Sequence, residues 1–145
     1  MQSLPEAAAT LLRGPAYGHV VTENEDGSPH VTMTWVDERD GELLLNTADG
    51  RRKVRNLRRN PDVVVSIQDP EEPQQYLLVT GRVVGMEEAG ADEHIDRLAQ
   101  IYLGTDEYPW HQPDETRLIV RITPERISGQ GPWGRQQPKH VLDDE

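Results

Sequence analysis

Two Asp-Gly pairs, Asp26-Gly27 and Asp40-Gly41, constrain the fold of this chain most. Asp-Gly is a pair that tight hairpin turns favour, because both residues adopt positive φ at low cost. The segments on either side of these pairs alternate apolar or β-branched residues with polar ones, a pattern typical of half-buried strands. The pattern predicts three consecutive antiparallel strands, a meander, at residues 17–23, 30–36 and 42–46.

The rest of the chain predicts further helices and strands. A first helix is expected at residues 3–12 and a second across the basic segment 51–59, where Asn60-Pro61 ends it. Three more strands are expected at residues 63–68, 76–86 and 117–127, with a helix at 91–103. Two glycines, Gly81 and Gly85, fall inside one of these strands and predict bulges there.

Six antiparallel strands of this length favour a closed or nearly closed barrel, since closure removes exposed edges. We therefore predict a mainly β (α+β) fold, a six-stranded antiparallel barrel with flanking helices, and the family resemblance described below implies that it is a split β-barrel. The barrel is expected to form a single domain over residues 1–128, followed by a C-terminal tail over residues 129–145.

The amino-acid composition excludes several kinds of functional site. The 145 residues include no cysteine, which excludes disulfides, thiolate metal sites and a cysteine nucleophile. The five histidines lack metal-ligand spacing, so we predict no metal site, and no catalytic acid or base stands out. The first residues lack a basic leader and no apolar run is long enough to cross a bilayer, so we expect a cytoplasmic protein without membrane contact.

The charge of the chain is unevenly distributed. The formal net charge is −11, which disfavours nucleic acid as a partner. Six of the 15 Lys and Arg residues nevertheless lie within residues 51–59, which contain no acid, and the remaining chain carries a net charge of −17. A basic helix face is often only solvated. A solvated face usually mixes signs, however, so an anionic ligand explains this segregation better.

The basic helix is expected to bury Val54 and Leu57, with Lys53 and Arg58 at the seam between helix and barrel. Its first turn would carry Arg51 and Arg52, beside free backbone N–H groups that already favour an anion. The end of the preceding strand adds the amide of Asn46 and the hydroxyl of Thr47. Together these residues predict a phosphate site.

Four segments give the chain a resemblance to a known family: DGSPHVTMTWVD (26–37), LLLNTADGRRKVRNLRRNPDVVV (43–65), YLLVTGRV (76–83) and RITPERISG (121–129). They resemble the split β-barrel group that includes pyridoxamine 5′-phosphate oxidase, an FMN-binding barrel, and the flavin- or deazaflavin-dependent oxidoreductases. The most specific motif is R-x-K-x-R-N-L-R-R followed by x-P.

The resemblance implies a homodimer with two cofactor sites at the subunit interface. It implies that Arg51 and Lys53 hold the cofactor phosphate, that residues 30–35 lie under the tricyclic ring, and that residues 74–76 reach the site from the partner chain. It also implies that Trp133 closes the pocket, and the alternative is that Met33, Trp35 and Trp133 are core residues. The implied cofactor-binding residues are His30, Thr32, Met33, Thr34, Trp35, Asn46, Thr47, Arg51, Arg52, Lys53, Arg58, Gln74, Gln75 and Tyr76.

Two cofactors fit this resemblance, coenzyme F420 and FMN, since both carry a phosphate. F420 also carries a polyglutamate tail, which the surplus cations Arg52, Arg55, Arg58 and Arg59 would attract. We therefore expect an F420-dependent oxidoreductase that transfers a hydride between the cofactor and an unsaturated or carbonyl small-molecule substrate. The alternatives are an FMN-dependent oxidoreductase or oxidase of the same fold, and a non-enzymatic flavin or deazaflavin carrier.

Overall fold

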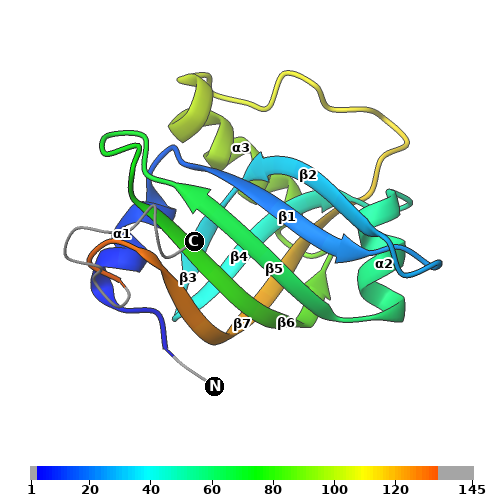
Figure 1. The fold of residues 1–145 in the computed structure, drawn as a ribbon. Coiled ribbons are helices and arrows are strands. Elements are labelled where there is room, and N and C mark those ends of the chain that lie inside the picture. Colours follow the sequence, from blue (N-terminus) through cyan, green and yellow to red (C-terminus); the bar gives the residue numbers. More distant parts are fainter. Residues whose placement is uncertain (1–2, 134–145) are drawn as a thin grey trace.

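The computed structural model describes residues 3–133, which form one antiparallel sheet flanked by three helices (Figure 1). In chain order the elements are α1 (Glu6–Arg13), β1 (Tyr17–Glu23), β2 (Pro29–Trp35), β3 (Asp37–Arg39), β4 (Glu42–Ala48), α2 (Arg52–Arg59), β5 (Asp62–Gln68), β6 (Tyr76–Glu87), α3 (Ala91–Leu103) and β7 (Arg117–Gln130). The predicted antiparallel split barrel is thus confirmed, with one strand more than predicted.

The order of strands across the sheet is β2-β1-β5-β6-β7-β4-β3. The two outermost strands, β2 and β3, follow one another in the chain with only Val36 between them, so the sheet curls into a half-barrel. The hydroxyl of Tyr102 on α3 fixes this join, because it accepts a hydrogen bond from the Val36 N–H at 2.9 Å. Its single hydrogen is shared between the carbonyls of Ala16 and Val36, 2.7 and 2.8 Å away.

The predicted strands and helices are confirmed within a few residues, but the predicted meander is wrong. The strand after the Asp40-Gly41 turn, β4, pairs with β7 and β3 and not with β2. The turn itself forms, and it joins β4 to the three-residue strand β3, which the prediction lacked. The count is therefore seven strands and not six.

The two strand glycines lie at bulges, as predicted. The register between β6 and β7 shifts between Thr80 and Gly81 and again between Val83 and Gly85. A Cβ atom at Gly81 would lie 2.5 Å from the carbonyl oxygen of Thr123, so the two strands approach closely because this residue has no side chain.

The C-terminal part of the fold extends beyond the predicted boundary at residue 128. The strand β7 runs to Gln130, and Trp133 is only 6% exposed within the main hydrophobic core. The Trp133 indole N–H donates to the carbonyl of Tyr76 at 2.9 Å. Trp133 is thus a core residue beside α1, as the alternative interpretation expected, and its role in closing a cofactor pocket stays a prediction. Residues 134–145 of the predicted tail lie outside the described residues.

Within residues 3–133, no helix is long and apolar enough to cross a membrane.

Candidate functional site

The start of α2 places three cations at one end of the half-barrel. A turn at Asp49-Gly50, with φ of 93° at Gly50, leads from β4 into the helix, and Arg51 is its N-terminal cap. Arg51 and Arg52 are exposed, whereas Lys53 is only 5% exposed because it lies on the same helix face as the core residue Leu57, one turn further on. The predicted burial of this helix edge, including Leu57, is confirmed.

Lys53 carries a largely buried charge without a counter-ion among the residues that the structure describes. Its ammonium group forms no hydrogen bond or ion pair with any residue that the structure describes. The nearby cations Arg51 and Arg117 repel it. Burial, reinforced by these two cations, lowers the pKa of Lys53 from 10.5 to about 8. A buried charge is costly unless it is paired. The position is therefore suited to an anion supplied from outside the chain.

Polar atoms on β2 face the same place. The Thr32 hydroxyl and Nδ1 of His30 are buried and have no hydrogen-bond partner among the described residues. The Thr47 hydroxyl at the end of β4 is also buried and unpartnered within this part of the chain. A first hollow of about 450 Å³ is lined by His30, Thr32, Met33, Thr34, Arg51, Arg52 and Lys53.

A second hollow of about 230 Å³ adjoins the first and shares Met33, Thr34 and Arg51 with it. Its other lining residues are Tyr17, Trp35, Asn46, Ile95, Tyr108, Trp110 and Arg117. Most of these side chains are aromatic or apolar, and the polar ones include a further cation.

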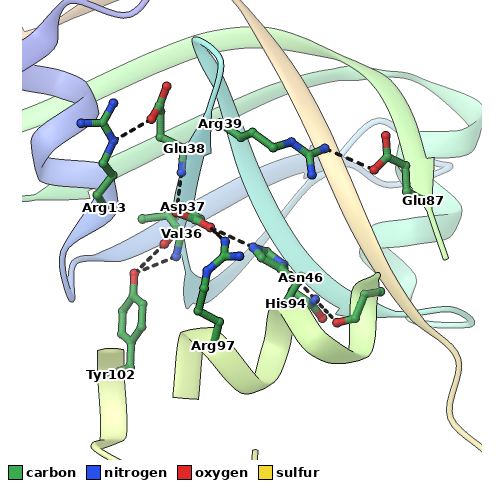
Figure 2. A network of polar contacts seen from close by, with 11 residues as sticks. Arg13, Val36, Asp37, Glu38, Arg39, Asn46, Glu87, His94, Arg97 and Tyr102 are labelled. Carbon is green, nitrogen blue, oxygen red and sulfur yellow. Dashed lines mark hydrogen bonds and ion pairs between the residues drawn. The ribbon is translucent and has the colours of Figure 1, made fainter. Parts of the chain in front are cut away.

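A buried polar network connects Asn46, which lines the second hollow, to His94 and Asp37 (Figure 2). The Asn46 amide donates to the Ala91 carbonyl at 2.9 Å, which fixes its orientation, so its other N–H points to Nδ1 of His94 at 3.0 Å. Nδ1 therefore accepts, and the opposite ring nitrogen donates to Asp37 at 2.9 Å. The Asp37 carboxylate also accepts a hydrogen bond from Nη2 of Arg97 at 2.8 Å. Burial alone would raise the pKa of this carboxyl, but its hydrogen bonds lower the pKa below the ordinary value.

The Asn46 carbonyl oxygen completes the network by accepting from Nε of Arg117 at 2.8 Å. Both polar atoms of the Asn46 amide are thus engaged within the protein. Asn46 therefore orients Arg117, and its predicted place beside the phosphate stays a prediction. The sequence analysis missed His94 and Arg117. The signal for His94 was its spacing with Ala91, Ile95 and Leu98 on the buried face of α3.

The predicted site residues fall into three groups. Those that line the first hollow are His30, Thr32, Met33, Thr34, Arg51, Arg52 and Lys53, with Trp35 and Asn46 beside them in the second. Thr47 is buried nearby. Gln74, Gln75 and Tyr76 line neither hollow, and the expectation that they reach a partner's site stays a prediction.

The placement of Arg58 at the seam of α2 is wrong. Arg58 is exposed and pairs with Asp49 at 2.8 Å. The buried edge is taken by Asn56 instead, whose amide donates to Thr22 and Asn24 at 3.0 Å each. An amide can be satisfied there by neutral acceptors, whereas a guanidinium would need a counter-ion.

The remaining arginines of α2 bind mostly within the protein. Arg55 donates to the Gly50 carbonyl and Arg59 to the Glu23 carbonyl. A carbonyl acceptor does not neutralise the positive charge of an arginine. Of Arg55, Arg58 and Arg59, only Arg58 forms an ion pair with an acid within the described part of the chain. The outer face of α2 therefore keeps a positive potential.

The curled antiparallel sheet with three flanking helices defines a split β-barrel, and a cationic hollow lies at the N-terminus of α2. The family model described as pyridoxamine 5′-phosphate oxidase matches residues 4–131, and the chain belongs to this family. No curated protein is detectably similar to it in sequence.

Solved structures support the same assignment. One named F420 reductase is 31% identical, with a TM-score of 0.75, over 88% of this chain and 100% of that chain. A conserved hypothetical protein from Mycobacterium tuberculosis is 24% identical, with a TM-score of 0.66, over 89% of this chain and 87% of that one. The general stress protein 26 of Bacillus anthracis is 21% identical, with a TM-score of 0.64, over 86% and 91%. The last two support the fold alone.

Proposed function

We propose that this protein is an oxidoreductase that uses coenzyme F420 and acts on an unsaturated or carbonyl small-molecule substrate. The observation that carries the proposal is Lys53, a buried cation with no partner among the described residues, on a fold shared with an F420 reductase at 31% identity. Neither the fold nor the charge alone would specify a redox cofactor.

The first hollow fits the phosphate of such a cofactor. Arg51, Lys53 and Arg117 lie close enough to affect one another, and the acid nearest to them is Glu115, 3.8 Å from Arg51 and 3.3 Å from Arg117. Three cations against one carboxylate leave two positive charges in a partly buried place. A phosphate would neutralise this excess and accept hydrogen bonds from Lys53 and from the Thr32 hydroxyl.

The bound cofactor would supply the hydride chemistry, and the protein would supply binding and orientation. Lys53 and Arg51 would fix its anionic end. The Met33 and Thr34 walls would separate that end from the second hollow, where a substrate can approach. We assign no side chain as acid or base.

We propose a homodimer as the working assembly. The register of β1 and β2 places Tyr17, Val31 and Met33 on the outward face of the sheet, where they are 43%, 55% and 60% exposed. Tyr17 packs edge-on against Tyr102 of α3 with ring centroids 5.5 Å apart, so α3 covers one end of this face and leaves Val31 and Met33 open. Exposed apolar side chains gathered on one face are typical of protein interfaces. The predicted contribution of Gln74–Tyr76 to a neighbouring site also requires a partner subunit. We propose in addition that the protein is cytoplasmic.

FMN is the alternative cofactor, and a carrier without turnover is the alternative function. The arginines on the outer face of α2 support F420, because its polyglutamate tail is anionic and Arg52, Arg55 and Arg59 outnumber Glu25 and Asp26 in the hollow that these five residues line. An FMN protein would purify yellow with flavin absorbance, which distinguishes it from an F420 protein. A carrier would bind the cofactor and show no turnover with any acceptor.

The test is a fluorescence titration with F420. Lys53→Ala should weaken binding by roughly 1.5–3 kcal/mol, the scale of a charge-assisted hydrogen bond. Arg82→Ala is the control, because Arg82 is an exposed residue of β6 paired with Asp62 and lines neither hollow. Unchanged affinity in Lys53→Ala, or no F420 binding at low micromolar concentration by the wild type, would overturn the proposal.

A further inference from the structure

One carboxylate lies among the cations of the candidate site. Oε1 of Glu115 is 3.3 Å from Nη1 of Arg117 and 3.8 Å from Nη2 of Arg51. The Glu115 side chain is only 12% exposed. Arg51 and Arg117 are also the two cations that repel Lys53. Glu115 is therefore an internal counter-ion for part of the positive charge that an anionic ligand would meet.

The main chain holds Glu115 beside the N-terminus of α2. The Thr116 carbonyl accepts a hydrogen bond from the Asp49 N–H at 2.8 Å, which ties the start of β7 to the turn before the helix. The Glu115 N–H donates to the Gln112 carbonyl at 3.1 Å. Both hydrogen bonds are made by backbone groups, so a substitution of the Glu115 side chain leaves them in place.

The Glu115 carboxylate acts on its neighbours mainly through its charge. Oε2 of Glu115 and Nη1 of Arg117 are both buried and have no hydrogen-bond partner within residues 3–133. The Arg117 guanidinium is held from elsewhere, because its Nε donates to the Asn46 carbonyl oxygen at 2.8 Å and its central carbon lies 5.1 Å from the ring centroid of Tyr108. Glu115 thus places a negative charge next to an anion site and repels any anion that enters it.

We propose that Glu115 selects the ligand by the charge of its phosphate, so that the site favours a singly charged phosphodiester over a doubly charged phosphomonoester. The proposal rests on the proposed function, because it concerns the anionic end of the same cofactor. F420 carries its phosphate as a diester. FMN carries a monoester, whose second pKa of about 6 leaves it with nearly two negative charges at neutral pH. Coulomb energy is proportional to the charge of the ligand, so the repulsion from Glu115 is about twice as large for the monoester.

The test compares FMN with its phosphate methyl ester, two probes that share the ring and the ribityl chain and differ by one charge. Binding of each probe to the full chain is followed by flavin fluorescence at neutral pH, in the wild type and in Glu115→Gln. We expect Glu115→Gln to bind the methyl ester about threefold and FMN about tenfold more tightly than the wild type does, because the logarithm of the gain doubles with the charge. An unchanged ratio of the two affinities, or weaker binding of both probes, would overturn the proposal.

Two variants serve as controls. Asp114→Asn removes the same charge one residue away, from an exposed side chain where solvent and salt screen it, and should leave the ratio unchanged. Glu115→Asp retains the charge and should retain the wild-type ratio. If Glu115→Gln fails to fold, Glu115→Ser removes the charge with a smaller side chain, and an unchanged ratio in that variant would equally contradict the role of Glu115.

A parallel titration with F420 separates this proposal from the proposed function. If F420 does not bind but the two flavin probes respond as expected, the assignment of F420 fails and the role of Glu115 remains. If F420 binds and Glu115→Gln leaves the ratio unchanged, the proposed function stands and the role of Glu115 is wrong. If neither flavin probe binds to the wild type or to any variant, the proposal is also wrong.

Discussion

Replacing Lys53 by Met should stabilise the ligand-free protein while it weakens anion binding. Methionine has nearly the length and flexibility of lysine and carries no charge, so it fits the same space between α2 and the sheet. Lys53 is 5% exposed and has no counter-ion among the described residues. The wild-type residue therefore lowers the stability of the protein in the absence of an anion.

The magnitude follows from the pKa of Lys53, which burial lowers from 10.5 to about 8. One pKa unit corresponds to about 1.4 kcal/mol, so the charged form costs on the order of 3 kcal/mol in the folded state. The folded protein binds fewer protons than the unfolded chain between these two pKa values. The cost is therefore complete below pH 8 and disappears as the pH rises toward 10.5.

The assay is urea unfolding of wild type and Lys53→Met at a series of pH values from 6 to about 10.5. The variant should be more stable by about 3 kcal/mol at pH 7, and the difference should shrink above pH 8. Taking the difference cancels other groups that titrate in this range. Arg52→Met is the control, since Arg52 is exposed and should change stability little. A variant that is less stable than wild type at pH 7, or a difference independent of pH, would refute this account of Lys53.

Three further predictions concern the scaffold around the site, and each is checked by chemical denaturation. Gly81→Ala should destabilise the protein strongly, because the new Cβ would lie 2.5 Å from a backbone carbonyl oxygen. Gly85→Ala should destabilise it less, because the nearest atom, 3.1 Å away, belongs to a flexible arginine side chain. Equal losses of stability in the two variants would contradict this geometry. Tyr102→Phe should cost roughly 1–3 kcal/mol, because it leaves buried backbone groups at the join of β2 and β3 unsatisfied; an unchanged midpoint would show that the hydroxyl does not hold the join. Asp37→Asn should destabilise the protein by a similar amount, since it removes the negative charge to which His94 and Arg97 both donate hydrogen bonds. Unchanged stability would show that this network contributes little to folding.

Local sequence signals predicted most elements of the fold but not their pairing. The helix α3 and the strand β1 have the predicted bounds, because periodicity and turn residues are local properties. The partner of β4 is β7, which lies far along the chain, and nothing local to residues 42–48 encodes that choice. The strand β3 was missed for a related reason: three residues are too few for alternation, and they form a strand only because β4 lies beside them.

The same distinction explains the candidate site. Lys53 was predicted from a helical wheel, which a single helix determines. Arg117 was missed because its role depends on Asn46, and Asn46 depends on His94, so the three residues come from β7, β4 and α3. Such a network appears only when distant strands and a helix are packed together.

The predicted and the missed residues together indicate how the site works. A fold of marginal stability keeps an unpaired buried charge only where a bound ligand repays the cost, and Lys53 is such a position among the described residues, whereas the neighbouring Arg117 is paired with Glu115 at 3.3 Å. An anion in the first hollow would therefore be held mainly by Lys53 and Arg51, which line that hollow, and Arg117 would add only the part of its charge that Glu115 leaves.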